Sequence, residues 1–165
     1  MEMARQDPER IIGMVLANTG HAGKGTGERE KRQAKVDLGN KDMRALADQW
    51  LPPMLAPGKE TDQTLMDALI DMVLKAGPEV HERQITALLH RPDAGACLQK
   101  ITCPILLLTG SEDGWSPVAQ HREMQELAQN AVLQIVQGAG HFMPIEKPRE
   151  TAEAVRNWIR DHFHA

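Results

Sequence analysis

The hydrophobic positions of this chain fall into two kinds of pattern. Three short apolar runs, at residues 11–17, 103–109 and 131–136, are rich in aliphatic side chains and predict buried strands. Between the first and second runs, apolar residues recur at helical spacing instead. Three such stripes predict amphipathic helices: Met43-Leu46-Ala47-Trp50, Leu65-Leu69-Met72-Val73 and Ile85-Leu88-Leu89.

Proline and glycine mark the ends of these predicted helices. Pro52, Pro53 and Pro57 interrupt the helical pattern after the first stripe, and Gly77-Pro78 divides the helices that follow. Residues 1–6 have helical composition. Residues 20–27 include four glycines and predict a flexible linker.

Two further helices are predicted beside the later strands. Ser116 and Pro117 predict the N-cap and first residue of a helix that reaches about residue 129. Pro148 predicts the start of a last helix, with Ala152, Val155 and Ile159 on one apolar face. The order strand, helical insertion, strand, helix, strand, helix predicts an α/β fold with a parallel sheet.

Composition narrows the classes of function. The 165 residues include 19 basic and 23 acidic side chains, a net charge of −4, which does not indicate a nucleic-acid-binding surface. The two cysteines suggest no disulfide framework. No apolar run is long enough for a membrane span, and no signal peptide is visible. We therefore predict a cytoplasmic protein that binds neither nucleic acid nor membrane.

Histidines and carboxylates show no metal-ligand spacing, so neither a metal nor a cofactor is predicted. All histidines but one are expected at the surface: His21, His81, His90, His121, His162 and His164.

The exception is His141, which pairs in the sequence with Asp113. Gly110-Ser111-Glu112-Asp113 ends the second strand run, and Gly140-His141 follows the third. The ligand crevice of a parallel α/β sheet lies at the carboxyl ends of its strands, so these two side chains can meet there. A carboxylate that orients a neutral imidazole is the acid–base pair of acyl-transfer catalysis, and Asp before His fits one known triad order.

That order places the nucleophile upstream, but no residue of the chain has the required setting. A nucleophile on a sharp strand-to-helix turn needs Gly two residues before it and two after it. Ser111, Ser116, Cys97 and Cys103 all lack this pair of glycines. Proline also follows Ser116 and Cys103, and proline has no N–H to offer an oxyanion.

Three motifs together resemble the α/β-hydrolase family, and the resemblance covers essentially the whole chain. Residues 8–16 are similar to the helix end and sixth strand that follow the nucleophile elbow. Residues 103–117, with G-x-x-D-x-x-x-P, are similar to the seventh strand and acid loop. Residues 138–142, followed by Glu146 and Pro148, are similar to the eighth strand, base loop and final helix.

The resemblance implies a partial α/β-hydrolase fold with three parallel strands, flanking helices and a helical cap insertion. Residues 1–19 would be a helix end and strand of the core sheet, 20–93 the cap, and 94–165 the C-terminal core. Asp113 would be the catalytic acid and His141 the base, while no position matches the nucleophile. Trp115 and Phe142 flank this pair and either line a substrate pocket or simply pack.

The activity implied is hydrolysis of an ester, lactone or similar carbonyl substrate by a Ser-Asp-His mechanism. The chain would be inactive alone, because the family's first five strands and its nucleophile have no counterpart here. The absence of Tyr disfavours the epoxide hydrolase branch, and the haloalkane dehalogenase branch stays open.

A hypothesis of a different class is a non-catalytic fragment that self-associates or complements another chain. The strand at 11–17 would expose a row of unpaired backbone groups, and such an edge favours a homodimer.

Overall fold

The computed structural model describes residues 1–163 and divides into two compact units. The core unit comprises Met1–His21, Met54–Pro57 and the residues from Ala94 onward. The helical unit comprises Ala22–Pro53 and Gly58–Asp93. The segment Met54–Pro57 therefore belongs to the core unit, although residues of the helical unit flank it in sequence on both sides.

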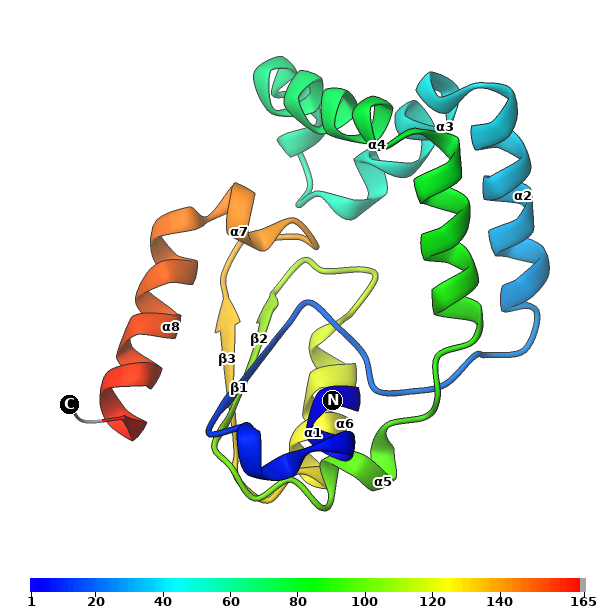
Figure 1. Cartoon of the computed structure of the whole chain (residues 1–165). Helices are drawn as coiled ribbons and strands as arrows, with labels where there is room; N and C mark the ends of the chain where they lie inside the picture. Colours follow the sequence, from blue (N-terminus) through cyan, green and yellow to red (C-terminus); the bar gives the residue numbers. More distant parts are fainter. Residues whose placement is uncertain (164–165) are drawn as a thin grey trace. The chain divides into compact units, whose positions relative to one another are not determined.

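Within residues 1–163, the core unit contains one parallel sheet. Its strands are β1 (Met14–Ala17), β2 (Ile105–Gly110) and β3 (Ala131–Val136), in the spatial order β1-β2-β3 (Figure 1). The predicted class, three parallel strands with flanking helices, is confirmed. The helical segments of this unit are α1 (Glu2–Gln6), η1 (Pro8–Arg10), α5 (Gly95–Leu98), α6 (Val118–Leu127), α7 (Met143–Glu146) and α8 (Pro148–His162).

The two faces of β2 pack against different helices, because successive side chains of a strand point to opposite sides. Leu107 packs in one cluster with Met124 of α6. Leu106 and Leu108 pack in another with Trp158 of α8. Figure 1 shows α6 and α8 on opposite sides of the strands. All six residues of β2 are buried, so this strand is a rigid support for the loop that follows it.

The outer strands β1 and β3 are less buried than the sequence predicted. β1 begins at Met14 rather than at residue 11, and Ile12 is 75% exposed. The Met14 amide donates to the carbonyl of Pro104 at 3.0 Å, and Pro104 has no N–H with which to extend the ladder to earlier residues. In β3 only Val136 is buried. Both strands are edge strands, because within the described residues each pairs with β2 alone.

The contact face of α8 also differs from the prediction. Trp158 is its buried residue, and Val155 packs beside it against the sheet. Ile159 is 46% exposed and Ala152 is exposed, so two of the three residues of the predicted face point away from the core. The large indole of Trp158 provides more apolar surface than any neighbour, and its burial sets the rotation of the helix.

The helical unit follows the predicted stripes. Its elements are α2 (Glu28–Lys41), α3 (Met43–Trp50), η3 (Lys59–Thr61) and α4 (Gln63–Leu89), and η2 (Pro52–Met54) ends where the chain enters the core unit. Gly77, with φ 73° and ψ 172°, interrupts the helical geometry of α4 just before Pro78, as predicted. The buried members of the stripes are Leu46, Ala47, Leu69, Val73, Ile85 and Leu89.

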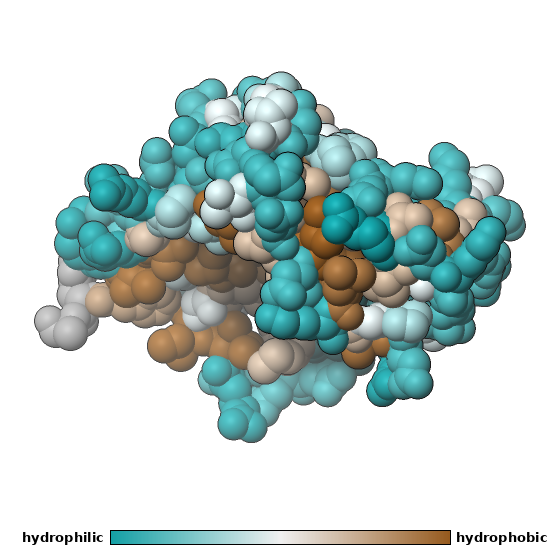
Figure 2. Space-filling model, turned by 90° about the horizontal axis from the view of Figure 1, so that it is seen from above, coloured by the Kyte–Doolittle hydropathy of each residue, from teal (hydrophilic) through white to brown (hydrophobic). Residues whose placement is uncertain are grey.

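The surface seen from above is mostly hydrophilic and is interrupted by hydrophobic patches (Figure 2). Met72 and Leu88, two stripe residues of α4, are 48% and 39% exposed. No helix within residues 1–163 combines the length and the apolar character that crossing a bilayer requires.

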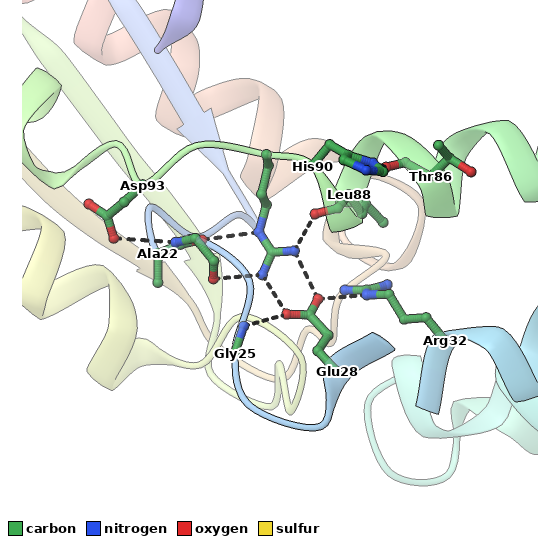
Figure 3. A network of polar contacts seen from close by, with 10 residues as sticks. Ala22, Gly25, Glu28, Arg32, Thr86, Leu88, His90 and Asp93 are labelled. Carbon is green, nitrogen blue, oxygen red and sulfur yellow. Dashed lines mark hydrogen bonds and ion pairs between the residues drawn. The ribbon is translucent and has the colours of Figure 1, made fainter. Parts of the chain in front are cut away.

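The glycine-rich segment predicted as a flexible linker is held in place by Arg91 and Glu28. Figure 3 shows Ala22, Gly25 and Glu28 within this network of polar contacts. The guanidinium of Arg91 donates to the carbonyls of Ala22 and Gly23 at 3.0 and 3.1 Å. It also contacts both carboxylate oxygens of Glu28, at 2.8 and 2.9 Å, and Glu28 accepts from the Gly25 amide. The hydrogen bond from Arg91 is the main cause that lowers the pKa of Glu28 to about 2.

We expect Arg91→Met to lower the free energy of unfolding by about 2 kcal/mol, because a bidentate, partly buried ion pair and hydrogen bonds to three carbonyls, those of Ala22, Gly23 and Leu88, are lost. Hydrogen exchange at the Gly25 amide should also become faster. Arg83→Met is the matched control, since Arg83 pairs with Glu79 on an exposed helix face, where such pairs contribute roughly 0.5 kcal/mol or less. If the two substitutions lowered the free energy of unfolding equally in urea, Arg91 would not hold the glycine-rich segment in place.

Two of the histidines predicted at the surface are buried. His81 is 4% exposed and His121 is fully buried, and burial lowers the pKa of both imidazoles. His81 continues the stripe of Ile85 and Leu89 at four-residue spacing, a pattern that would have indicated burial. His90 and His162 are exposed, as predicted, His21 is half-buried, and His164 lies outside the described residues.

Candidate active site

A polar side chain follows each strand of the sheet at its carboxyl end. Asn18 comes directly after β1, Asp113 lies three residues beyond β2, and His141 follows β3. The strands are parallel, so these three loops meet at one edge of the sheet. The structure brings all three side chains together.

Asp113 is anchored first by its own loop. The residue is 3% exposed, and its Oδ1 accepts hydrogen bonds from the amides of Trp115 and Ser116, both at 2.8 Å. Helix α6 then begins at Val118 with Pro117 at the N-cap and no side-chain cap, so the predicted Ser116 cap is wrong.

His141 meets the carboxylate through one ring nitrogen. Its Nδ1 lies 3.0 Å from Oδ2 and 3.2 Å from Oδ1 of Asp113. Asn18 adds a further donor, since its Nδ2 lies 2.8 Å from the same Oδ2. The His141 side chain is 24% exposed, whereas that of Asp113 is fully buried. With Nδ1–H directed at Asp113, Nε2 is the ring atom that can exchange a proton with a reacting group.

The environment keeps Asp113 ionised. Burial acts to raise its pKa, but hydrogen bonds from His141, Asn18 and the Ser116 amide outweigh burial and lower the pKa to about 2. The carboxylate is therefore charged near neutral pH, and it can stabilise an imidazolium on His141.

The acid loop and the base loop are hydrogen-bonded directly to each other. The Glu112 amide donates to the carbonyl of Ala139 at 2.9 Å, and the Gly138 amide donates to Ser111 Oγ at 2.9 Å. Gly110 permits this approach, because a Cβ at this position would overlap the Ala139 carbonyl oxygen. The contact between Asp113 and His141 is thus built into the chain path and needs no ligand to form it.

The aromatic candidates lie next to the base. The ring centroids of Trp115 and Phe142 are each 6.3 Å from that of His141. Trp115 is 37% exposed, so one side of its indole faces solvent. These positions suit residues that contact a substrate bound at His141.

The serines and cysteines are engaged elsewhere. Ser111 Oγ contacts Glu112 Oε1 at 3.1 Å and accepts from Gly138, and Ser116 is buried behind Asp113. Cys97 and Cys103 line a cavity of about 370 Å³ that precedes β2, at the opposite end of the strand from Asp113. Within residues 1–163, no group of three or more His, Cys, Asp or Glu side chains is arranged to hold a metal ion.

Two residues of this site were not foreseen from the sequence. Asn18 follows the predicted strand at 11–17, so the rule that selected Asp113 and His141 also applies to it. Its φ of +46°, unusual for a residue other than Gly, turns the chain just after β1. Glu146 is 8% exposed and accepts from the Gly140 amide at 3.1 Å. Its spacing from His141 was noted in the sequence, but its burial was not foreseen.

Comparison with known proteins supports this architecture. A family model described as TAP-like protein matches residues 87–162, a span that includes Asp113 and His141. No curated protein matches the chain significantly. Solved structures match over nearly its whole length. A thermophilic esterase from Thermogutta terrifontis aligns with a TM-score of 0.88 at 24% identity, and an enol-lactonase from Burkholderia xenovorans with 0.84 at 21%; each alignment covers 96% of this chain and 60% of the other.

An α/β-hydrolase enzyme from a Medee basin deep-sea metagenome aligns with a TM-score of 0.79 at 20% identity, over 96% of this chain and 59% of the other. The chain has part of the α/β-hydrolase fold. It spans about 60% of the length of the α/β-hydrolase structures that it matches.

Proposed function

We propose that this chain supplies the acid and the base of a hydrolase that cleaves an ester, lactone or similar carbonyl substrate by a Ser-Asp-His mechanism. The observation that carries the proposal is the 3.0 Å contact between His141 Nδ1 and the buried carboxylate of Asp113. In this scheme Asp113 fixes the tautomer of His141 and stabilises the imidazolium.

His141 Nε2 would take the proton of a serine hydroxyl as the oxygen attacks the substrate carbonyl. The proton then passes from the imidazolium to the leaving alkoxide, and an acyl-enzyme remains. In the second half, Nε2 takes a proton from water as the water attacks the acyl group, and the imidazolium returns it to the serine. Asp113 stays ionised throughout, in accord with a pKa of about 2.

The nucleophile of this scheme lies outside residues 1–163. Ser111 Oγ is hydrogen-bonded to Glu112 and Gly138, and Ser116 is buried. Cys97 and Cys103 lie beyond the far end of a six-residue strand, roughly 20 Å long. These contacts support a serine that is contributed by residues beyond those described.

The class of substrate is supported by the relatives, two of which are an esterase and an enol-lactonase. We propose Trp115 and Phe142 as substrate contacts and residues 20–93 as the helical cap. The partner is then a small molecule, and the sequence-based prediction of a cytoplasmic location stands as part of this proposal.

Incubation of the purified chain with a fluorophosphonate probe tests the missing nucleophile. We expect no covalent adduct by intact-protein mass spectrometry and no burst with an activated ester, because no hydroxyl within the described residues contacts His141. Stoichiometric labelling of Ser111 or Ser116 would overturn the assignment.

The DNA upstream of Met1, read in the same frame, tests whether a nucleophile is encoded there. A strand followed by G-x-S-x-G would supply the nucleophile elbow. The longer polypeptide should then hydrolyse esters, and His141→Gln in it should abolish turnover while leaving the fold intact.

A second function rests on a different observation, the open edge of β1. Within the described residues β1 pairs only with β2, and Val15 and Ile12 are 39% and 75% exposed. An apolar edge of this kind favours pairing with another chain, such as a second copy. Size-exclusion chromatography with light scattering decides it, since a stable monomer would count against self-association.

A further inference from the structure

Glu146 is a buried carboxylate that takes no part in the proton transfers described above. It ends the short helix α7, five residues after His141, and is 8% exposed. Both of its oxygens accept hydrogen bonds from backbone amides. Oε1 accepts from Gly140 at 3.1 Å and Oε2 accepts from Ala56 at 2.8 Å.

These two amides come from distant parts of the sequence. Gly140 belongs to the base loop, and Ala56 belongs to Met54–Pro57, the segment of the core unit that interrupts the helical unit. The same segment also binds His141 directly, because the His141 amide donates to the Met54 carbonyl at 2.7 Å. Met54–Pro57 therefore holds the backbone of the base loop at two neighbouring residues, at His141 directly and at Gly140 through Glu146.

The packing at Gly140 shows how closely the two backbones approach. A Cβ on Gly140 would lie 2.5 Å from the Ala56 nitrogen and 2.6 Å from the Leu55 carbonyl carbon. Such distances leave room only for hydrogen, so Gly140 lies directly against the segment. Glu146 bridges the two backbones at this point of contact.

A carboxylate suits this bridge for a simple chemical reason. Each oxygen can accept a hydrogen bond from one of two separate N–H groups. A glutamine offers only one oxygen, and its NH₂ group would face the second N–H, donor against donor. The bridge thus depends on the negative charge and the length of Glu146.

We propose that Glu146 is a positioning residue for His141: by joining the base loop to Met54–Ala56 it sets the imidazole against Asp113. Its importance for catalysis rests on the proposed hydrolase function, but the geometry it enforces does not. Met54–Pro57 is then a structural part of the base loop, contributed by the middle of the insertion.

Native-state hydrogen exchange of the unmodified chain is the first test. The amides of Ala56, Gly140 and His141 should open as one unit, with equal free energies of opening, because breaking the bridge releases all three. Independent opening of Ala56 and Gly140 would overturn the proposal without any variant.

Glu146→Gln is the second test, with Glu150→Gln, an exposed position in the first turn of α8, as the matched control. Exchange at Ala56 should become roughly tenfold faster. The downfield proton resonance of His141 Nδ1–H bound to Asp113 should be lost or shifted. Amides of β2 should stay protected, and the control should change neither signal.

A Glu146→Gln chain with faster exchange at Ala56 but an unchanged Nδ1–H resonance would reduce Glu146 to a structural residue and refute positioning. Glu146→Asp keeps the charge but is one methylene shorter, so an intermediate effect on both signals is expected. None of these measurements needs turnover. A failed search for the nucleophile would therefore refute the proposed function and leave the positioning result intact.

Discussion

Asp113→Asn is expected to lower the free energy of unfolding by about 3 kcal/mol at pH 7. The amide that replaces the carboxylate has a single acceptor atom. If that oxygen receives the amides of Trp115 and Ser116, the new NH₂ group faces the Asn18 donor and His141. Urea unfolding followed by tryptophan fluorescence measures the change. Glu112→Gln is the matched control, because Glu112 is the neighbouring carboxylate and is exposed.

The same substitution should lower kcat about 10⁴-fold in a polypeptide that carries the nucleophile, as a wrong imidazole tautomer does in a Ser-His-Asp triad. Facing an NH₂ group, His141 would turn Nδ1 into an acceptor and place its proton on Nε2, where the base must be unprotonated. A normal rate in the Asp113→Asn variant would exclude Asp113 as the catalytic acid.

The pH dependence of the free energy of unfolding is an independent test of the ionised state of Asp113. Its pKa is about 2 in the folded chain against an ordinary value of 3.8, so the unfolded chain binds the proton more readily. The carboxylate thus contributes about 2 kcal/mol above pH 3.8, and this contribution is lost as the pH falls toward 2. The Asp113→Asn variant should lack that part of the acid-induced loss, so its unfolding energy should approach that of the unmodified chain at low pH.

Gly110→Ala is the second substitution with a large expected effect, a loss of more than about 3 kcal/mol. The added methyl would overlap the Ala139 carbonyl oxygen and lie 2.6 Å from the Ala139 carbonyl carbon and 2.8 Å from the Gly140 oxygen. Backbone atoms cannot rotate aside as a side chain can, so the acid loop and the base loop must separate. Urea unfolding measures the cost, and the His141 Nδ1–H resonance reports the separation.

Gly114→Ala is the control for that result. A Cβ at Gly114 meets nothing within 4 Å, and its backbone is not in the left-handed region, so alanine should be neutral or slightly stabilising. Gly114 is the matched control because both glycines lie close together in the chain. If both substitutions lowered the free energy of unfolding by similar amounts, the acid loop would be sensitive to any change, and the effect at Gly110 would not be evidence of its close contact with the base loop.

Much of the fold could be predicted from the sequence because its signals are local. The apolar run at 105–108 forms a strand buried on both faces, and Gly77-Pro78 interrupts α4 where the sequence placed the break. The predictions were wrong where the burial of a strand depends on which other strands lie beside it. The run at 131–136 resembles a central strand in composition, yet within the described residues it forms an edge, because strand order is not encoded in any single strand. The edge at 11–17 was expected, but only from the family resemblance.

The site shows the same division. Asp113 and His141 could be selected from the sequence because each follows a strand, and parallel strands bring their carboxyl ends to one edge. Asn18 obeys the same rule but was overlooked, since an amide does not suggest acid–base chemistry. Nothing in the sequence linked Glu146 to Ala56, because the pairing of two residues 90 positions apart depends on where the chain returns to the core.

The sequence by itself determined the strands, the helices, and the carboxylate and imidazole at the ends of two strands, because these features depend on residues within one or two turns of each other. Only the tertiary structure decided how far the residues of the outer strands are buried, which histidines are buried and which side chains hold the pair in place. Those features depend on contacts between distant segments, which form only when the hydrophobic faces of the sheet and helices have packed together.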